Sequence, residues 1–207
     1  MSKTTRRTVG IAAVVGIALL VLPALLFAWG EVGHRLIGEE MVRSLAPGRQ
    51  IEIGFPDFAA QNAKATLKDK ESKDVGSAIL TQTPAGVLIT LSVNGLPAGE
   101  HAFHVHGIGK CEPPFMSAGG HFNPDKKKHG MMAQDGPHAG DMPNLHIPAN
   151  GELAVEVLNA AVTLEKGKPN SLFGPEGTAL IIHAGKDDYR TDPTGEAGGR
   201  IACGLVE

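Results

Sequence analysis

The pattern of apolar and polar positions divides the chain into three parts. Val9–Trp29 is a run of 21 residues without a charged side chain. As a helix rising about 1.5 Å per residue, it would span roughly 30 Å, the thickness of the hydrocarbon layer of a bilayer. In residues 31–61 apolar side chains recur at helical spacing until Pro47, which predicts a short amphipathic spacer helix without chemistry of its own.

The first part, residues 1–30, predicts that the chain is exported. Lys3, Arg6 and Arg7 precede the apolar run, so the amino end should stay in the cytoplasm while the rest crosses the membrane. The run exceeds the roughly 7–15 apolar residues of a cleavable signal peptide, which favours an uncleaved membrane anchor. Residues 28–30 nevertheless resemble a cleavage site, so both alternatives stay open. We expect the protein in the periplasm or cell envelope, with or without an anchor in the inner membrane.

The third part, residues 62–207, predicts an all-β domain. Its short apolar runs alternate with polar residues or are bounded by turn signals such as Asn94-Gly95, which is typical of an antiparallel sandwich or barrel. The expected strands include 64–68, 77–81, 87–93, 153–157, 162–164, 179–182 and 200–203. Residues 107–150 are the exception, because they are rich in Gly and Pro and show little periodicity. A loop this long usually has a function.

Composition and charge narrow the class of protein. Aromatic residues make up only 4% of the chain, so the core must be aliphatic. The net charge is −3 and residues 1–30 contribute +3, so the rest of the chain carries −3 − (+3) = −6 and no nucleic-acid partner is expected. Cys111 and Cys203 would form one disulfide in an oxidising compartment, whereas in the cytosol they would be free thiols or metal ligands.

Histidine is concentrated in the loop-rich stretch. Seven of the nine histidines fall between residues 101 and 146, and an eighth is His183. Histidine is the commonest nitrogen ligand for copper and zinc. The concentration therefore predicts a metal site, and more than one ion.

Two groups of ligands follow from the spacing. His104 and His106 are two residues apart in an apparent strand, so both imidazoles leave the same face and can reach one ion. With His121 and the distant His183 they would make a four-nitrogen set, which suits Cu(II). A second set would supply three nitrogens and one carboxylate to a tetrahedral zinc ion. Its members are His121, His129, His138 and Asp141.

The remaining histidines have plainer interpretations. His101 should face away from His104 and is expected to be a structural histidine bonded to the backbone, while His34 and His146 are expected on the surface. Lys126–Lys128 precede His129. They are expected to be a solvated loop face, and the alternative is that they attract an anionic substrate.

Six separate motifs match one known family in order. They are Gly99–His106, Ser117–Pro124, Lys128–Gly130, Gly136–Asp141, Ile182–His183 and Gly199–Gly204. On these motifs residues 62–207 resemble a copper/zinc superoxide dismutase of the bacterial, exported type. The resemblance implies an eight-stranded Greek-key β-barrel with long metal-binding loops, here preceded by an N-terminal hydrophobic helix.

The resemblance also implies an activity and a role for each residue. Superoxide would be converted to O₂ and H₂O₂ by cycling between Cu(II) and Cu(I), with zinc and an imidazolate bridge supporting the copper site. His104, His106, His121 and His183 would bind copper, and His121 would also join His129, His138 and Asp141 on zinc. Asp187 would link one histidine of each metal, Arg200 would draw the anion towards copper, and Cys111 would pair with Cys203.

A rival function and the oligomeric state both stay open. The rival function is a periplasmic copper or zinc buffer without turnover, which would need neither Arg200 nor a bridging histidine. The expected partners are superoxide and, if residues 1–30 are retained, the membrane. A homodimer and a monomer both stay open.

Overall fold

The computed structural model describes residues 61–207, so the predictions for the hydrophobic segment, for the spacer at 31–61 and for His34 lie outside the described residues. Within 61–207 no helix is long and apolar enough to span a bilayer. This part of the chain consists of strands, loops and one short 3-10 helix, as the sequence predicts. The elements are β1 (Asn62–Lys68), β2 (Asp74–Thr83), β3 (Gly86–Val93), β4 (Gly99–His101), β5 (Phe103–His106), η2 (Met116–Ala118), β6 (Leu145–Ile147), β7 (Leu153–Asn159), β8 (Ala179–His183) and β9 (Arg200–Leu205).

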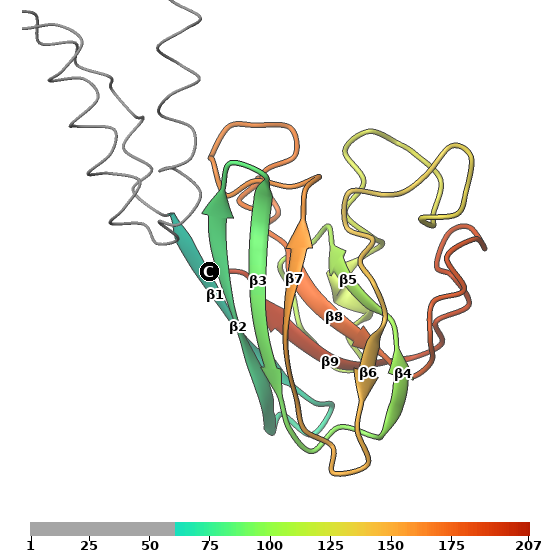
Figure 1. Cartoon of the computed structure of the whole chain (residues 1–207). Helices are drawn as coiled ribbons and strands as arrows, with labels where there is room; N and C mark the ends of the chain where they lie inside the picture. The colour runs from blue at the N-terminus through green and yellow to red at the C-terminus, as the bar shows by residue number, and fades with distance from the viewer. Residues whose placement is uncertain (1–60) are drawn as a thin grey trace, which may run out of the picture. The chain divides into compact units, whose positions relative to one another are not determined.

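The strands form a curled antiparallel sheet in the order β5-β8-β9-β1-β2-β3-β7, with β4 and β6 as a separate pair. Figure 1 shows β1, β2, β3 and β7 on one side and β5, β8 and β9 crossing behind them. β7 lies beside β3 although β4, β5 and β6 come between them in the chain, which is the return connection of a Greek key. The all-β Greek-key prediction is therefore confirmed.

The predicted strand through the histidine motif is divided at Ala102. On one side β4 pairs with β6, and on the other β5 pairs with β8. At the change of partner the N–H of Ala102 donates to Gly185 O at 2.8 Å, and its carbonyl accepts from His183 N at 2.9 Å. Because β4 and β5 follow one another through this single residue, the nine segments amount to eight strands, the number that the family resemblance implies.

Two predictions about local structure are wrong. Residues 162–164 are not a strand, since Thr163 makes only an isolated bridge to Ser171. The stretch 107–150 is not free of regular structure, because it contains η2 and β6. β6 has only three residues and is stabilised by its pairing with β4, a contact that its own sequence does not reveal.

The core is aliphatic, as the shortage of aromatic residues predicts. Alternate residues of the strands point inwards, for instance Leu67 of β1, Leu80 of β2 and Ile89 of β3, each 0% exposed. A second, smaller apolar cluster lies on the other face of β8 and β9 and contains Phe115 and Ile181. This smaller apolar group attaches the loop that follows β5 to the sheet, because Phe115 comes from that loop and Ile181 from β8.

Candidate metal centre

The outer face of β5 presents two histidines. Phe103 and Val105 belong to the core, so His104 and His106 leave the opposite face, where loops bury them completely. His183, at the end of the neighbouring β8, continues this row of imidazoles.

The loop after β5 folds back along the strand it has left. His121 forms an isolated bridge with His106, and Asp141 forms one with His104. Between them the N–H of Val105 donates to Gly140 O at 2.9 Å. A Cβ at Gly140 would overlap the Val105 carbonyl, so only glycine allows the two backbones to approach this closely. The pairing sets distant loop residues beside the histidines of β5.

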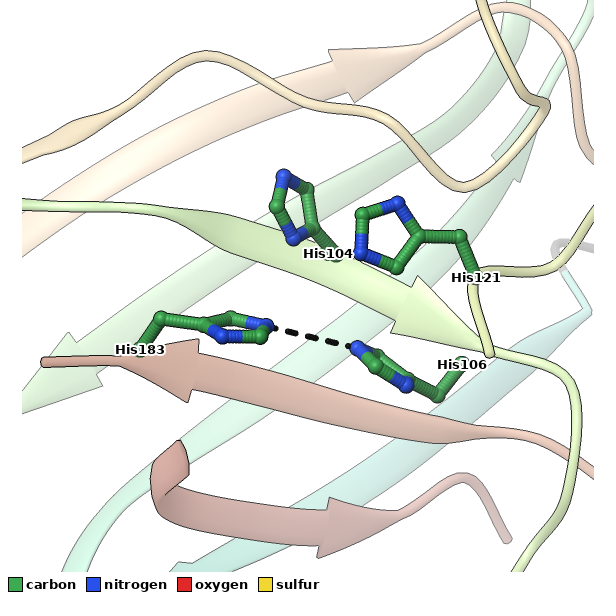
Figure 2. Close-up of side chains that lie close together, drawn as sticks. All are labelled: His104, His106, His121 and His183. Carbon is green, nitrogen blue, oxygen red and sulfur yellow. Dashed lines mark hydrogen bonds between the residues drawn. The ribbon is translucent and has the colours of Figure 1, made fainter. Parts of the chain in front are cut away.

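The first cluster is the set His104, His106, His121 and His183, whose ligand atoms lie within 4.8 Å of one another. Figure 2 shows the four rings converging, with Nε2 of His106 lying 3.4 Å from Nε2 of His183. Two buried atoms of this cluster, His104 Nδ1 and His121 Nε2, have no hydrogen-bond partner among the described residues. Buried polar atoms are nearly always satisfied, so these two nitrogens have the chemistry of metal-binding atoms.

The opposite nitrogen of each ring is fixed by the protein. His104 Nε2–H donates to Asp187 Oδ2 at 2.8 Å. His106 Nδ1–H donates to Gly119 O at 2.9 Å, and His183 Nδ1–H donates to Gly198 O at 3.3 Å. Each of these three rings therefore turns a lone pair towards the centre, as metal-ligating histidines do when their other ring N–H is hydrogen-bonded to a carboxylate or a backbone carbonyl.

The second cluster surrounds the carboxylate of Asp141. Its Oδ1 lies 2.9 Å from His121 Nδ1, 3.1 Å from His129 Nδ1 and 3.4 Å from His138 Nδ1. Its Oδ2 accepts the backbone N–H groups of Gly130 and His138 at 2.9 and 3.0 Å. Three imidazole nitrogens and one carboxylate oxygen are the donor set of a closed zinc site.

Asp187 joins the two clusters. Besides His104 of the first, it accepts from His129 Nε2–H of the second at 2.9 Å, through its other oxygen. Asn144 holds Asp187 in turn, because its side-chain N–H donates to Asp187 O at 2.9 Å and its side-chain oxygen accepts from Asp187 N at 2.8 Å. The backbone N–H of Asn144 donates to the Tyr189 hydroxyl.

The clusters differ in electrostatics. In the first, burial lowers the pKa of His183 to about 3, and the neighbouring imidazoles and Arg200 act in the same direction, so this ring is neutral. Burial also lowers the pKa of His121 to about 4, against the pull of Asp141. Burial would lower the pKa of His129 too, but the carboxylates of Asp141 and Asp187 outweigh it and raise the pKa to about 9. Hydrogen bonds from the histidines lower the pKa of Asp141 despite its burial.

Arg200 lies at the edge of the first cluster. It faces His183 across the β8–β9 pair, at a register shift. Its guanidinium donates to the carbonyls of Phe115 and Gly119. Gly119 O also accepts from His106, so the same carbonyl holds the arginine and a histidine of the cluster.

Cys111 and Cys203 form a disulfide, with their Cα atoms 5.7 Å apart. The bond ties the loop that contains Gly119 to β9, the strand that begins with Arg200. Of the alternatives that the cysteine count left open, the disulfide is the one present.

The structure thus gathers all the predicted candidates at one centre. The other histidines behave as predicted within the described residues: buried His101 bonds the carbonyls of His183 and Pro97, and the side chain of His146 is 73% exposed. Sequence reasoning missed Asn144 and Tyr189, since both act through Asp187 and no spacing rule connects them. The two orphaned nitrogens and the mixed donor set fit one copper and one zinc ion.

Comparison with known proteins agrees with this chemistry. Residues 75–206 match the family model for copper/zinc superoxide dismutase. The chain is 57% identical over 157 residues to "Superoxide dismutase [Cu-Zn] 1" of Aquifex aeolicus, an alignment that covers 74% of this chain and 93% of that protein.

Solved structures extend the likeness to the fold. A crystal structure of a SOD-like protein from Bacillus subtilis has a TM-score of 0.68 and 38% identity, and the match covers 72% of this chain and 100% of that one. The Cu/Zn superoxide dismutase from Brucella abortus has a TM-score of 0.59 and 25% identity, covering 71% and 100%. This chain belongs to the copper/zinc superoxide dismutase family, as an enzyme that uses copper and zinc to convert superoxide to O₂ and H₂O₂.

Proposed function

We propose that His104, His106, His121 and His183 hold the copper ion on which superoxide reacts. This assignment is supported by two buried nitrogens, His104 Nδ1 and His121 Nε2, which have no hydrogen-bond partner within residues 61–207 and belong to the group formed by the four rings. The remaining nitrogen of each ring is engaged elsewhere, so each histidine has one lone pair left for the ion.

We further propose that His129, His138 and Asp141 hold zinc together with His121. This assignment is supported by the donor set, since three nitrogens and one carboxylate suit tetrahedral zinc. His121 belongs to both groups and offers a different nitrogen to each. It is therefore the residue proposed to bridge the two ions as imidazolate.

Copper supplies the one-electron redox couple that dismutation requires, and zinc supplies a fixed positive charge. The chain contributes the geometry and the protons. In a state in which copper does not occupy His121 Nε2, this is the atom at which the chain would hold a proton for the product peroxide, because Nδ1 stays directed at the Asp141 side. Asp187 would keep the rings of His104 and His129 in fixed orientation, since it accepts a hydrogen bond from each.

Arg200 is proposed to guide the superoxide anion. Its side chain is partly exposed and its positive charge acts on His106 and His183, where it contributes to lowering their pKa values. A cation held beside the copper ligands attracts a small anion to the reacting position. Carbonyls of Phe115 and Gly119 fix this cation in place.

The test compares His183→Ala with His138→Ala in the metal-loaded protein. His183→Ala should lose copper and superoxide consumption while it keeps zinc, because His183 belongs to the first cluster alone. His138→Ala should lose zinc first. Metal content by mass spectrometry and superoxide consumption are the two readouts. A His183→Ala variant that keeps copper and full activity would contradict the assignment, and a wild type that binds both metals without turnover would restore the rival metal-buffer function.

We also propose that the protein works outside the cytoplasm. The support comes from the disulfide between Cys111 and Cys203 and from the apolar run Val9–Trp29 behind three basic residues. In this proposal residues 1–30 are a signal or an anchor and 31–61 a spacer. Sequencing the amino terminus of protein from the native membrane and soluble fractions decides between the two, and recovery of uncleaved, reduced protein in the cytosol would refute export.

A further inference from the structure

The loop between β8 and β9 contacts the second cluster at a residue that no metal motif contains. Asp192 Oδ1 accepts the backbone N–H of His129 at 2.8 Å. The same oxygen lies 3.9 Å from Nε2 of His138. Asp192 therefore reaches two of the proposed zinc ligands from a loop 50 residues or more further along the chain.

Each imidazole of the second cluster has its Nδ1 near Asp141 Oδ1 and its Nε2, the outer nitrogen, on the other side of the ring. His121 turns its outer Nε2 towards the first cluster, and His129 donates its outer Nε2–H to Asp187 at 2.9 Å. The outer Nε2 of His138 faces Asp192. Each of the two histidines that belong to the second cluster alone thus has a carboxylate beyond its outer nitrogen.

We propose that Asp192 is a positioning residue of the zinc site, which fixes His129 through its backbone and orients His138 through its charge. This inference rests on the proposed role of the second cluster in holding zinc. A carboxylate behind a ligating imidazole fixes the ring and raises its basicity, and removal of such a partner typically lowers metal affinity about 10–100-fold.

The two contacts of Asp192 differ in strength. The bond to His129 N is short and part of the loop-to-loop packing. The contact with His138 is too long for a direct hydrogen bond, and the Asp192 side chain is 49% exposed, so water and salt screen its charge. Most of the effect should therefore come from the backbone bond, and a smaller part from the charge.

Substitutions separate these parts in the full chain. In Asp192→Asn the amide oxygen can still accept from His129 N, whereas the charge is lost; Asp192→Ala loses both. Asp125→Asn, at an exposed acid of the loop between β5 and β6, is the matched control for charge. Zinc affinity is measured on copper-free protein by competition with a chelator. We expect a loss of at most about tenfold for Asp192→Ala, the low end of the range for outer partners of ligating histidines, because Asp192 makes no hydrogen bond to the His138 ring. We expect a smaller loss for Asp192→Asn and no loss for Asp125→Asn.

Cobalt bound in place of zinc gives a readout that a merely structural role would not move. Its visible absorption reports the ligand geometry, and we expect the spectrum of Asp192→Asn to shift while the melting temperature of the metal-free protein stays within a degree or two of wild type. Zinc affinities within twofold of wild type and unchanged cobalt spectra for both variants would overturn the inference. His138→Ala then distinguishes two reasons for such a result. If His138→Ala also binds zinc as wild type does, the proposed zinc ligand set is wrong. If His138→Ala loses zinc while both Asp192 variants keep it, the ligand set stands and only the role of Asp192 is wrong.

Discussion

Gly195 lies directly against the carboxylate of Asp187, which joins the two clusters. Its φ is +66°, and a Cβ at this position would overlap Asp187 Oδ1 and lie 2.6 Å from His129 Nε2. The side chain of any other residue would therefore occupy the space of the hydrogen bond between Asp187 and His129. The absence of a side chain at 195 is a condition for that bond.

We predict that Gly195→Ala weakens zinc binding about tenfold or more, because it displaces the Asp187 carboxylate from His129, a proposed zinc ligand. The positive φ adds roughly 1 kcal/mol of backbone strain to this variant. Gly167→Ala is the matched control, since its φ is +81° and a Cβ there would have no neighbour within 4 Å. Zinc affinity by chelator competition and the free energy of unfolding are measured for both. Equal losses of zinc affinity in the two variants would show that strain, and not the contact with Asp187, is responsible.

Residues differ in how far the sequence reveals them. The candidate ligands could be predicted because metal chemistry restricts residue type, and because spacings such as that of His104 and His106 fix a common face. Asn144, Asp192 and Gly195 could not be predicted, since their contacts depend on how two loops meet. A hydrogen bond from a backbone N–H to a carboxylate far along the chain has no periodicity that a sequence shows.

At the scale of elements, regular strands were predictable and their partners were not. The alternation of buried and exposed residues in β1 follows from the sequence alone. The division of one predicted strand at Ala102 does not, because it results from pairing with β6 on one side and β8 on the other. Residues 162–164 show the opposite error, since an apolar run needs a neighbouring strand to become part of a sheet.

The disulfide connects two elements of the centre, the loop that follows β5 and strand β9. It joins residues separated by 92 positions, and the loss of chain entropy in the unfolded state gives about 4–5 kcal/mol for a loop of this length. We predict that the double variant Cys111→Ser and Cys203→Ser loses stability by up to that amount and also loses activity, because the loop that carries the Gly119 carbonyl is freed from β9.

Denaturant unfolding and superoxide consumption measure the two effects, and wild type treated with a reductant should match the double variant. Full activity in a sample with demonstrably reduced cysteines would show that the loop keeps its place without the bond.

At the scale of the whole molecule, the net negative charge of the protein repels its anionic substrate. The chain has a net charge of −3 and superoxide is an anion, so encounter depends on local positive potential. In our proposal Arg200 supplies this potential beside the first cluster. Lys126, Lys127 and Lys128 are exposed just before His129, and Lys128 lies 3.8 Å from Asp135, a weak surface pair.

If the three lysines steer superoxide, their replacement by Gln should lower the rate of dismutation more at low salt than at high salt, because a Debye length of about 10 Å at 0.1 M screens exposed charges. The control replaces Lys64, Lys68 and Lys73, which are exposed on β1 and the turn after it, and makes the same change in net charge. Loss that is equal at both salt concentrations, or equal in the control, would leave the lysines as a solvated loop face.

The carbonyl of Gly119 accepts from both His106 and Arg200. A shift of this one oxygen would move His106, a proposed copper ligand, and Arg200, the proposed anion guide, together. Selection for tighter metal binding and selection for faster capture of substrate therefore act on the same atom. Substitutions near Gly119 that strengthen metal binding should therefore slow the capture of substrate, and the reverse. Substitutions on the far side of the barrel should not couple the two properties.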